Sequence, residues 1–238
     1  MLRITNLYHH YAEQMILKNI NLEFPSQTLC AIVGQSGCGK TTLLKLLAGV
    51  LEIQSGSILF TEQLKSKHAI SYVPQKMSLV PCYDVLGNIT LPLRLLGMSK
   101  KQAIETALPY LKEFHLQKIA HAYPNQISGG QAQKITLIRS LVTKPQLLLL
   151  DEPFSSIDPL GKRYLQEFLH QLKLKYQLTI ILVTHDLEEA VRLANNIYII
   201  KDGQLSTQMP INIPQDQRFN QNTAAEIAIL KEKIYHQV

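Results

Sequence analysis

The sequence has no run of about 18 uninterrupted apolar residues, the length that a helix needs to span a membrane. Its first residues, Met1 to Thr5, also lack the basic and then apolar order of a secretory signal. From these two absences we expect a cytoplasmic chain without a membrane span of its own.

Cysteines and clustered charges are scarce as well. Cys30, Cys38 and Cys82 are widely spaced and form no C-x-x-C pair, so reduced thiols are expected and a metal site built on cysteine is not. The net charge is +6, but the Lys and Arg residues form no basic block, which favours a solvated surface over binding to nucleic acid or to an anionic membrane. The 46% hydrophobic and 18% charged content is that of a globular protein, and 238 residues fit one domain, with or without a small insertion.

The clearest pattern is a glycine-rich stretch between an apolar run, Leu29 to Val33, and a predicted helix that ends near Gly49. Its residues are Gly34, Gln35, Ser36, Gly37, Cys38, Gly39, Lys40 and Thr41, followed by Thr42. Strand, loop and helix in this order are the context that the phosphate-loop pattern G-x-x-x-x-G-K-[ST] requires. Glycines let backbone N–H groups point at phosphate oxygens, and the helix N-terminus favours an anion. We therefore expect Lys40 to reach the β- and γ-phosphates and Thr41 to offer its hydroxyl to Mg²⁺; a plain glycine-rich turn is the weaker alternative.

Two acids follow a second predicted strand. The continuous apolar run Leu147 to Leu150 ends in Asp151 and Glu152, as expected at the carboxyl end of a buried parallel strand. Beside a phosphate loop, Asp151 would hold Mg²⁺ through water and Glu152 would act as general base for the attacking water. The alternative is a helix N-cap or a loop surface, although Pro153 makes a simple helix start awkward here.

Two polar residues lie at other junctions of the predicted fold. His185 ends the predicted buried strand Leu178 to Val183, where a lone histidine is as often structural as functional. Gln75 follows Tyr72-Val73-Pro74 where the sheet gives way to helices, and by itself it would be an unremarkable polar residue.

A further helix start is predicted at Ser128, with Gly129, Gly130 and Gln131 after it. Ser128 is a good N-cap and the glycines bare the backbone N–H groups, so this is either a second anion site or a flexible loop before a helix. One site needs only one such cradle, so a second implies a second ligand or a second copy of the chain.

The order of elements predicts an α/β fold. Strands Leu2 to Leu7 and Ile16 to Phe24 would flank a polar turn, His9 to Gln14, where Tyr8 or Tyr11 could be a core aromatic or a platform for a base. Short strands at Ser57 to Phe60 and Ala69 to Val73 would complete the sheet of the first half.

A helical insertion is predicted at about residues 76–140, and Pro109 should kink or break its third helix. Its helices are expected at Asp84 to Ile89, Leu91 to Gly97, Ser99 to Phe114 and Ser128 to Val142. The α/β pattern then resumes, with helices at Leu160 to Lys175 and Asp186 to Ala194, a hairpin at Asp202-Gly203, and a C-terminal linker and helix at about 208–238.

Six segments share the order and spacing of one known family: Gly34 to Thr42, Tyr72 to Gln75, Ile127 to Gln131, Leu147 to Pro153, Ser155 to Asp158 and Val183 to Asp186. Over essentially the whole chain they resemble the ATPase subunit of an ABC transporter. The Ser-Gly-Gly-Gln segment distinguishes this family from other phosphate-loop enzymes. The resemblance implies the phosphate-loop ABC ATPase fold as a single domain over residues 1–238, with a mostly parallel core sheet, an N-terminal antiparallel β subdomain and a helical insertion.

The resemblance also implies a role for each segment. Gly34 to Thr41 would be the Walker A loop, Asp151 the Walker B acid and Glu152 the catalytic base. Gln75 would touch Mg²⁺ and the attacking water, and His185 would contact the γ-phosphate. Ser128 to Gln131 would close over ATP on the opposite copy, Asp158 would lie in a loop that crosses the dimer, and Tyr11 fits the adenine-stacking aromatic better than Tyr8.

The family further implies the ligands ATP and Mg²⁺, a homodimer, membrane permease subunits, a substrate-binding protein and a position on the inner face of the membrane. Departures from the family pattern, such as Ile127 in place of the usual Leu, remove no catalytic group.

The tail segments Asp216 to Arg218 and Glu226 to Ile234 resemble the nitrate, sulfonate and taurine importer branch, which also includes importers of thiamine-precursor pyrimidines. The alternatives are an exporter or lipoprotein-release ATPase, a non-transport ABC ATPase acting in DNA repair or on ribosomes, and a phosphate-loop kinase. A kinase would leave Ser128 to Gln131 without a purpose. The transported substrate is not encoded in this chain, because permease and binding protein choose it.

Overall fold

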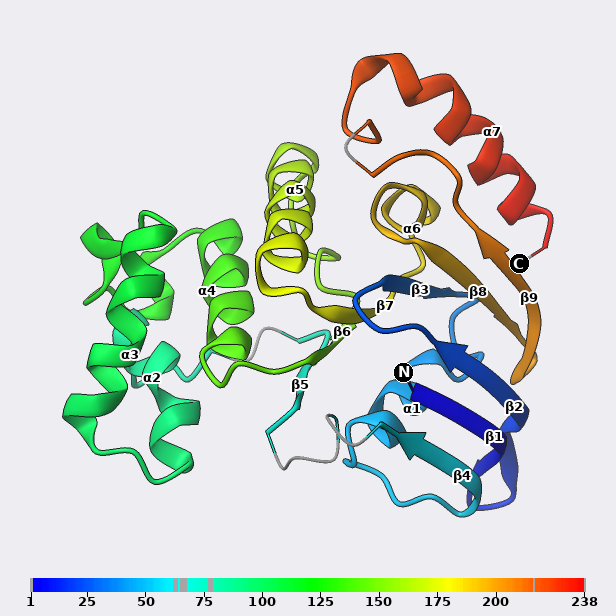
Figure 1. Ribbon diagram of the computed structural model, residues 1–238, viewed down its shortest axis with the longest axis horizontal. Coiled ribbons are helices and arrows are strands. Elements are labelled where there is room, and N and C mark those ends of the chain that lie inside the picture. Colours follow the sequence, from blue (N-terminus) through cyan, green and yellow to red (C-terminus); the bar gives the residue numbers. More distant parts are fainter. Residues whose placement is uncertain (1, 62–63, 65–67, 77–78, 216, 238) are drawn as a thin grey trace.

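The computed structural model describes residues 2–61, 64, 68–76, 79–215 and 217–237 and contains two β-sheets with helices around them (Figure 1). Asp216, the first residue of the tail pattern, lies outside the described residues, as do residues 77–78 near the start of the predicted insertion. Among the described residues, no helix is long and apolar enough to cross a membrane.

The N-terminal sheet has three antiparallel strands in the order β2-β1-β4. The strands are β1 (Leu2–Tyr11), β2 (Gln14–Phe24) and β4 (Ser55–Phe60). The predicted polar turn over His9 to Gln14 was wrong: β1 continues to Tyr11, because His9 is buried and Tyr11 still pairs with Gln14. The prediction that β4 continues the same sheet as Ala69 to Val73 was also wrong, since β4 pairs with β1.

The central sheet has six strands in the order β5-β6-β7-β3-β8-β9. They are β3 (Leu29–Val33), β5 (Ile70–Val73), β6 (Leu147–Asp151), β7 (Thr179–Val183), β8 (Asn196–Lys201) and β9 (Gln204–Pro210). All neighbours are parallel except β8 and β9, which form the predicted hairpin. The mostly parallel core sheet predicted from the sequence is thus confirmed.

Both faces of the central sheet are covered, which explains the unbroken apolar runs in its strands. Along β6, Leu147 and Leu149 join a core with α1 (Lys40–Leu47) and the N-terminal sheet. Leu148 and Leu150 face the opposite core, which is closed by α5 (Pro159–Tyr176), α6 (Leu187–Leu193) and α7 (Ala224–Tyr235). α1 therefore lies between the two sheets, and the loop before it opens at the carboxyl edge of the central sheet.

The predicted insertion stands to one side of the sheet as α2 (Val85–Leu95), α3 (Lys100–Glu113) and α4 (Gly129–Leu141) (Figure 1). Two predictions failed here. The two short helices expected before Gly97 are one helix that continues through Pro92, and α3 continues through Pro109. Each proline removes one backbone hydrogen bond, but buried residues one turn apart, Val85, Ile89 and Leu93 in α2, hold the helix against the core.

The C-terminal tail is held by Arg218, a residue of the tail pattern whose burial was not predicted from the sequence. Arg218 is 1% exposed and donates hydrogen bonds to four backbone carbonyls, those of Val191 and Ala194 in or just after α6 and those of Ile211 and Ile213 in the tail. Burial lowers its pKa to about 10. Through these hydrogen bonds Arg218 joins the tail to the end of α6.

Candidate nucleotide site

The glycine-rich loop is shaped by two glycines that no other residue could replace without strain. Gly34 and Gly39 have φ of 158° and 105°. A Cβ on Gly34 would lie 2.2 Å from the carbonyl oxygen of Ile200, and one on Gly39 would lie 2.6 Å from Leu17 Cδ2. The loop is therefore packed against β8 and β2, which fixes the direction of its backbone N–H groups.

Lys40, the first residue of α1, is folded back over this loop. Its side chain is buried, and Nζ donates hydrogen bonds to the carbonyl oxygens of Gly34 (2.7 Å) and Gln35 (2.8 Å). The ammonium is thus held inside the curve of the loop beside the N-terminus of α1. Burial raises the pKa of the neighbouring Cys38 thiol, so this cysteine stays protonated and leaves the local charge positive.

A cavity of about 510 Å³ opens over the loop, within the size range of small-ligand pockets. Its lining residues are Tyr11, Ile16, Ser36, Gly37, Gly39, Lys40, Thr41, Thr42, Gln75, Glu152 and His185. All of these except Ile16 were predicted from the sequence. Of the other predicted residues, Gly34, Gln35 and Cys38 support the loop without lining the cavity, and Asp151 lies beneath Thr41.

Glu152, at the end of β6, contacts residues at the ends of β5 and β7. It follows β6, where its backbone takes a left-handed φ of 45°, and its N–H donates to the carbonyl of Val183 in β7. One carboxylate oxygen accepts from Gln75 Nε2 (2.8 Å), and the other lies 3.1 Å from His185 Nδ1. A non-glycine residue in this region is strained, and such strain persists where the surroundings hold it. The structure therefore brings the three predicted catalytic residues together.

Asp151 is a buried carboxylate with two oxygen-bearing neighbours. Thr41 Oγ1 donates to Oδ1 (3.0 Å) and the hydroxyl of Tyr72 donates to Oδ2 (3.3 Å). Burial raises the pKa of Asp151, while these hydrogen bonds oppose the rise. Burial and the nearby Asp151 charge raise the pKa of Tyr72 to about 12. Sequence reasoning missed Tyr72, because nothing in the pattern distinguishes it from a residue of the core.

The oxygen atoms of Thr41 and Asp151 fit a magnesium ion that also binds phosphate. Mg²⁺ is usually held by one or two carboxylates together with substrate phosphates. In the described part of the chain, no three His, Cys, Asp or Glu side chains are grouped so that they could hold a metal ion. A site for Mg²⁺ at Thr41 and Asp151 therefore depends on the nucleotide.

Tyr11 stands at the rim of the cavity, 46% exposed, with its ring packed edge-on against His9 at 5.0 Å. Tyr8 does not line the cavity. Of the two tyrosines considered from the sequence, Tyr11 is therefore the one at the cavity.

Ser128 to Gln131 is not brought to this cavity. Ser128 caps α4 in a capping box, in which its Oγ accepts from Gln131 N (3.2 Å) and its N–H donates to Gln131 Oε1 (2.9 Å). These residues lie in the helical region, and a Cβ on Gly129 would lie 3.8 Å from Ile157. Asp158 caps α5 through Gly161 N (3.0 Å) and is exposed. The Ser128 and Asp158 segments are therefore neighbours on the surface, outside the cavity formed by their own chain.

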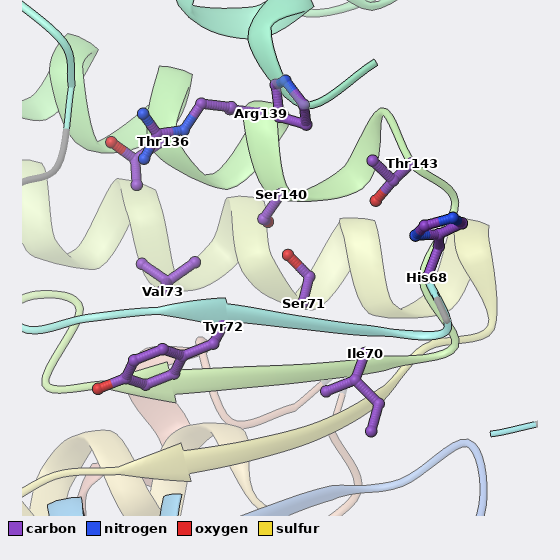
Figure 2. Close-up of a pocket in the computed structure, with 10 residues that line it drawn as sticks. His68, Ile70, Ser71, Tyr72, Val73, Thr136, Arg139, Ser140 and Thr143 are labelled. Carbon is purple, nitrogen blue, oxygen red and sulfur yellow. The ribbon is translucent and has the colours of Figure 1, made fainter. Parts of the chain in front are cut away.

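A second, smaller cavity of about 270 Å³ lies between β5 and α4. Figure 2 shows Ser71 and Val73 directed toward α4, while Tyr72 leaves β5 on the opposite side. The hydroxyls of Thr136 and Ser140 donate to carbonyls of their own helix, those of Ala132 and Leu137. These two hydroxyls are therefore already hydrogen-bonded within α4.

A phosphate loop between a central strand and a helix, with carboxylates at the end of a nearby parallel strand, defines a phosphate-loop nucleotide-binding enzyme. The family model described as ABC transporter matches residues 17–155, more than half of the chain. The chain belongs to the ABC transporter family.

Three curated relatives are import ATP-binding proteins. The taurine import protein of Escherichia coli (strain K12) is 38% identical over 89% of this chain and 85% of its own length. The aliphatic sulfonates import protein of Corynebacterium glutamicum is 34% identical over 96% of this chain and 92% of its own length. The sulfate/thiosulfate import protein of Mannheimia succiniciproducens is 38% identical over 86% of this chain, which spans 60% of that protein.

A solved structure agrees with the fold and the chemistry. The dimeric post-hydrolysis state of the ATP-binding cassette MJ0796, bound to ADP and Pi, has a TM-score of 0.75 and 28% identity, and the match covers 89% of this chain and 99% of that one. With the site described above, these findings identify the chain as an ATPase whose nucleotide is ATP.

Proposed function

We propose that residues 1–238 act as one ATPase domain that drives a separate membrane permease, and that Mg-ATP binds in the cavity over the phosphate loop. The observation that carries this proposal is the position of Glu152, whose carboxylate is held by Gln75 and His185 in the wall of that cavity. Lys40 would bind the β- and γ-phosphates, Tyr11 would stack on adenine, and Thr41 with Asp151 would hold Mg²⁺.

In the proposed reaction, Glu152 takes a proton from a water molecule as the water oxygen bonds to the γ-phosphorus. The bond between the γ-phosphorus and the bridging oxygen breaks, and ADP and phosphate leave. Gln75 would orient the water and His185 would hold the γ-phosphate. When bound, Mg²⁺ would neutralise developing phosphate charge.

A single copy leaves the start of α4 without a ligand. We propose that Ser128 to Gln131 close over ATP bound to a second copy, so that two copies pack head to tail around two nucleotides. The exposed Ser128 and Asp158 segments, which adjoin each other, would form this contact. ATP would then favour the closed pair because it binds that state more tightly than the open one.

The permease would dock on the helical region. A cavity of about 710 Å³ lies along α2 and the start of α3, and the exposed side chains of Leu95 and Met98 lie at it. Such an apolar surface is typical of a protein contact, and its occupant would keep the ATPase at the inner face of the membrane.

Import is the proposed direction, because all three relatives carry import in their names. Their sulfonate, taurine and sulfate cargoes favour an oxyanion of sulfur, delivered by a substrate-binding protein, over nitrate or a thiamine-precursor pyrimidine. An export or lipoprotein-release role is the alternative.

The test is Glu152→Gln, which keeps the volume of the side chain but removes the base. We expect hydrolysis to fall by about 10²- to 10⁴-fold while ATP still binds, measured by phosphate release and by binding of a fluorescent ATP analogue. Hydrolysis at the parental rate would remove Glu152 from the reaction. Purification of the parent protein from its native membrane then shows whether a permease co-purifies with it.

A further inference from the structure

His185 lies in a three-residue link between β7 and α6, with Thr184 before it and Asp186 after it. Its side chain is 64% exposed, and the contact that holds its ring is the one with Glu152. A ring this exposed needs a fixed backbone if its position is to be reproducible. The residues on either side of His185 supply that fixation.

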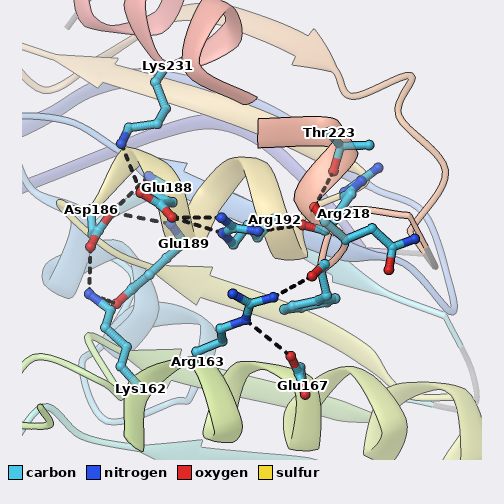
Figure 3. Close-up of polar contacts among 12 residues, drawn as sticks. Lys162, Arg163, Glu167, Asp186, Glu188, Glu189, Arg192, Arg218, Thr223 and Lys231 are labelled. Atoms are coloured by element: carbon cyan, nitrogen blue, oxygen red, sulfur yellow. Dashed lines mark hydrogen bonds and ion pairs between the residues drawn. The ribbon is translucent and has the colours of Figure 1, made fainter. Parts of the chain in front are cut away.

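These residues are joined to Lys162, on the first turn of α5. Lys162 Nζ lies 2.5 Å from Asp186 Oδ2 and 2.6 Å from Glu189 Oε1 (Figure 3). The other oxygen of Glu189 accepts from Thr184 Oγ1 (2.5 Å), and that hydroxyl accepts from the N–H of Asp186 (3.0 Å). We call Lys162, Thr184, Asp186 and Glu189 the clamp. It forms a closed set of contacts around the His185 backbone.

The clamp depends on a single cation. Glu189 is 2% exposed, and two carboxylates this close would repel each other without a positive charge between them. Within the described residues, the other cations paired with a carboxylate of α6 are Arg192 and Lys231, and both contact Glu188 instead, at 2.9 Å each. Burial alone would lower the pKa of Lys162, but its bonds to Asp186 and Glu189 raise it, so it remains charged.

The helix that carries Lys162 also gives the clamp a rigid base. Lys162 N–H donates to the carbonyl of Asp158 (2.8 Å), the N-cap of α5. The position of the His185 backbone is therefore tied to the start of α5, one turn after the exposed Asp158 segment.

We propose that Lys162 is a positioning residue for ATP hydrolysis, which holds Asp186 and Glu189 together and thereby fixes His185 at the cavity. This inference rests on the proposed role of His185. It adds a residue that lies outside the cavity and outside every motif recognised in the sequence.

The test compares Lys162→Met with Lys231→Met in the full chain. Each removes a lysine that pairs with a carboxylate of α6, but only Lys162 joins the residues that flank His185. We expect Lys162→Met to lower kcat by about ten- to a hundredfold, as expected when a reacting group is misplaced by about 1 Å. KM for ATP and ATP binding should change little, Lys162→Arg should restore most of kcat, and Lys231→Met should leave kcat near the parental value.

A cycle with His185→Ala separates this inference from the proposed function. If His185→Ala loses most of its hydrolysis, and adding Lys162→Met to it lowers the residual rate no further, the role of His185 and the positioning role of Lys162 are both supported. Near-parental hydrolysis by His185→Ala would contradict the role of His185 itself. If His185→Ala is impaired but Lys162→Met hydrolyses ATP like the parent, or if Lys231→Met loses as much kcat, the positioning role is overturned. Thermal unfolding should show a larger loss of stability for Lys162→Met, which leaves the buried Glu189 without its cation, than for Lys231→Met, which breaks an exposed ion pair, so kcat is compared at a temperature at which both variants are folded.

Discussion

Glycines adjoin the starts of both α1 and α4, yet the two starts are capped differently. α1 begins after Gly39, which offers no side-chain cap, and its first turn faces the cavity beneath the exposed rim of Tyr11. α4 begins at Ser128, whose capping box satisfies the N–H of Gln131. The first start leaves donors open for a ligand. The second is stable by itself and lies on the surface.

In the proposed head-to-tail pair, each chain would carry half of two sites, and the two helix starts would have different roles. The α1 side holds its charges in place before any ligand arrives, with Lys40 inside the loop and Asp151 bonded to Thr41. The α4 side needs no ligand to remain folded, so it can separate from a nucleotide at no cost to its helix. A surface of this kind suits a contact that forms and breaks in each cycle.

The largest effect is expected at Lys40, on the α1 side. Lys40→Ala removes the one buried ammonium of the loop, and hydrogen bonds to charged groups contribute about 1.5–3 kcal/mol each. We expect ATP binding to weaken by about ten- to a hundredfold and hydrolysis to vanish. Titration with a fluorescent ATP analogue measures the first, and unchanged affinity would show that the α1 start is not the phosphate cradle.

A substitution at the α4 start should separate binding from turnover. Ser128→Arg places a bulky cation where the second copy would present ATP, so we expect turnover to be abolished while one copy still binds ATP. Ser99→Arg is the matched control, because Ser99 caps α3 in the same kind of capping box with Gln102. Both variants lose about 1 kcal/mol of capping, but only Ser128→Arg should stop hydrolysis. Loss of ATP binding by single copies of Ser128→Arg would place Ser128 in the same site as Lys40.

The smallest effect is expected for Tyr72, whose hydroxyl bonds to Asp151 on the α1 side of the site. Tyr72→Phe removes a hydrogen bond to Asp151 and should cost about 1 kcal/mol of folding stability. The folded pKa of Tyr72, about 12, lies above its ordinary value of 10, so the neutral phenol stabilises the fold below pH 10. This stability is lost as pH rises toward 12, because the unfolded chain releases its proton first.

Urea unfolding of parent and Tyr72→Phe across that window tests this expectation. The difference in unfolding free energy between them should shrink as pH rises. A constant difference would mean that Tyr72 does not titrate as the buried partner of Asp151.

The sequence predicted the parts that local chemistry determines. A strand, a glycine-rich loop and a helix in this order are typical of a phosphate-binding loop, so the position of Lys40 at the cavity was predictable. The α4 helix start was predictable for the same reason. Helix ends near prolines were not, because the packing of Val85, Ile89 and Leu93 outweighs the hydrogen bond lost at Pro92.

Contacts between distant segments were out of reach. Tyr72 and Asp151 are 79 residues apart, and Lys162 and Asp186 are 24 apart. Tyr72 and Lys162 look like ordinary core and surface residues in the sequence, which does not show their contacts with Asp151 and Asp186. Only the parallel pairing of β5 with β6, and the packing of α5 beside α6, bring them together.

The central claim is that α1 of one copy and α4 of another share each nucleotide. The most direct measurement is the molar mass in solution of Glu152→Gln with and without Mg-ATP, compared with the double variant Glu152→Gln with Ser128→Arg. We expect the single variant to become a dimer only with ATP, and the double variant to bind ATP but stay a monomer. A single variant that remains monomeric in ATP, or a double variant that dimerises equally well, would contradict it.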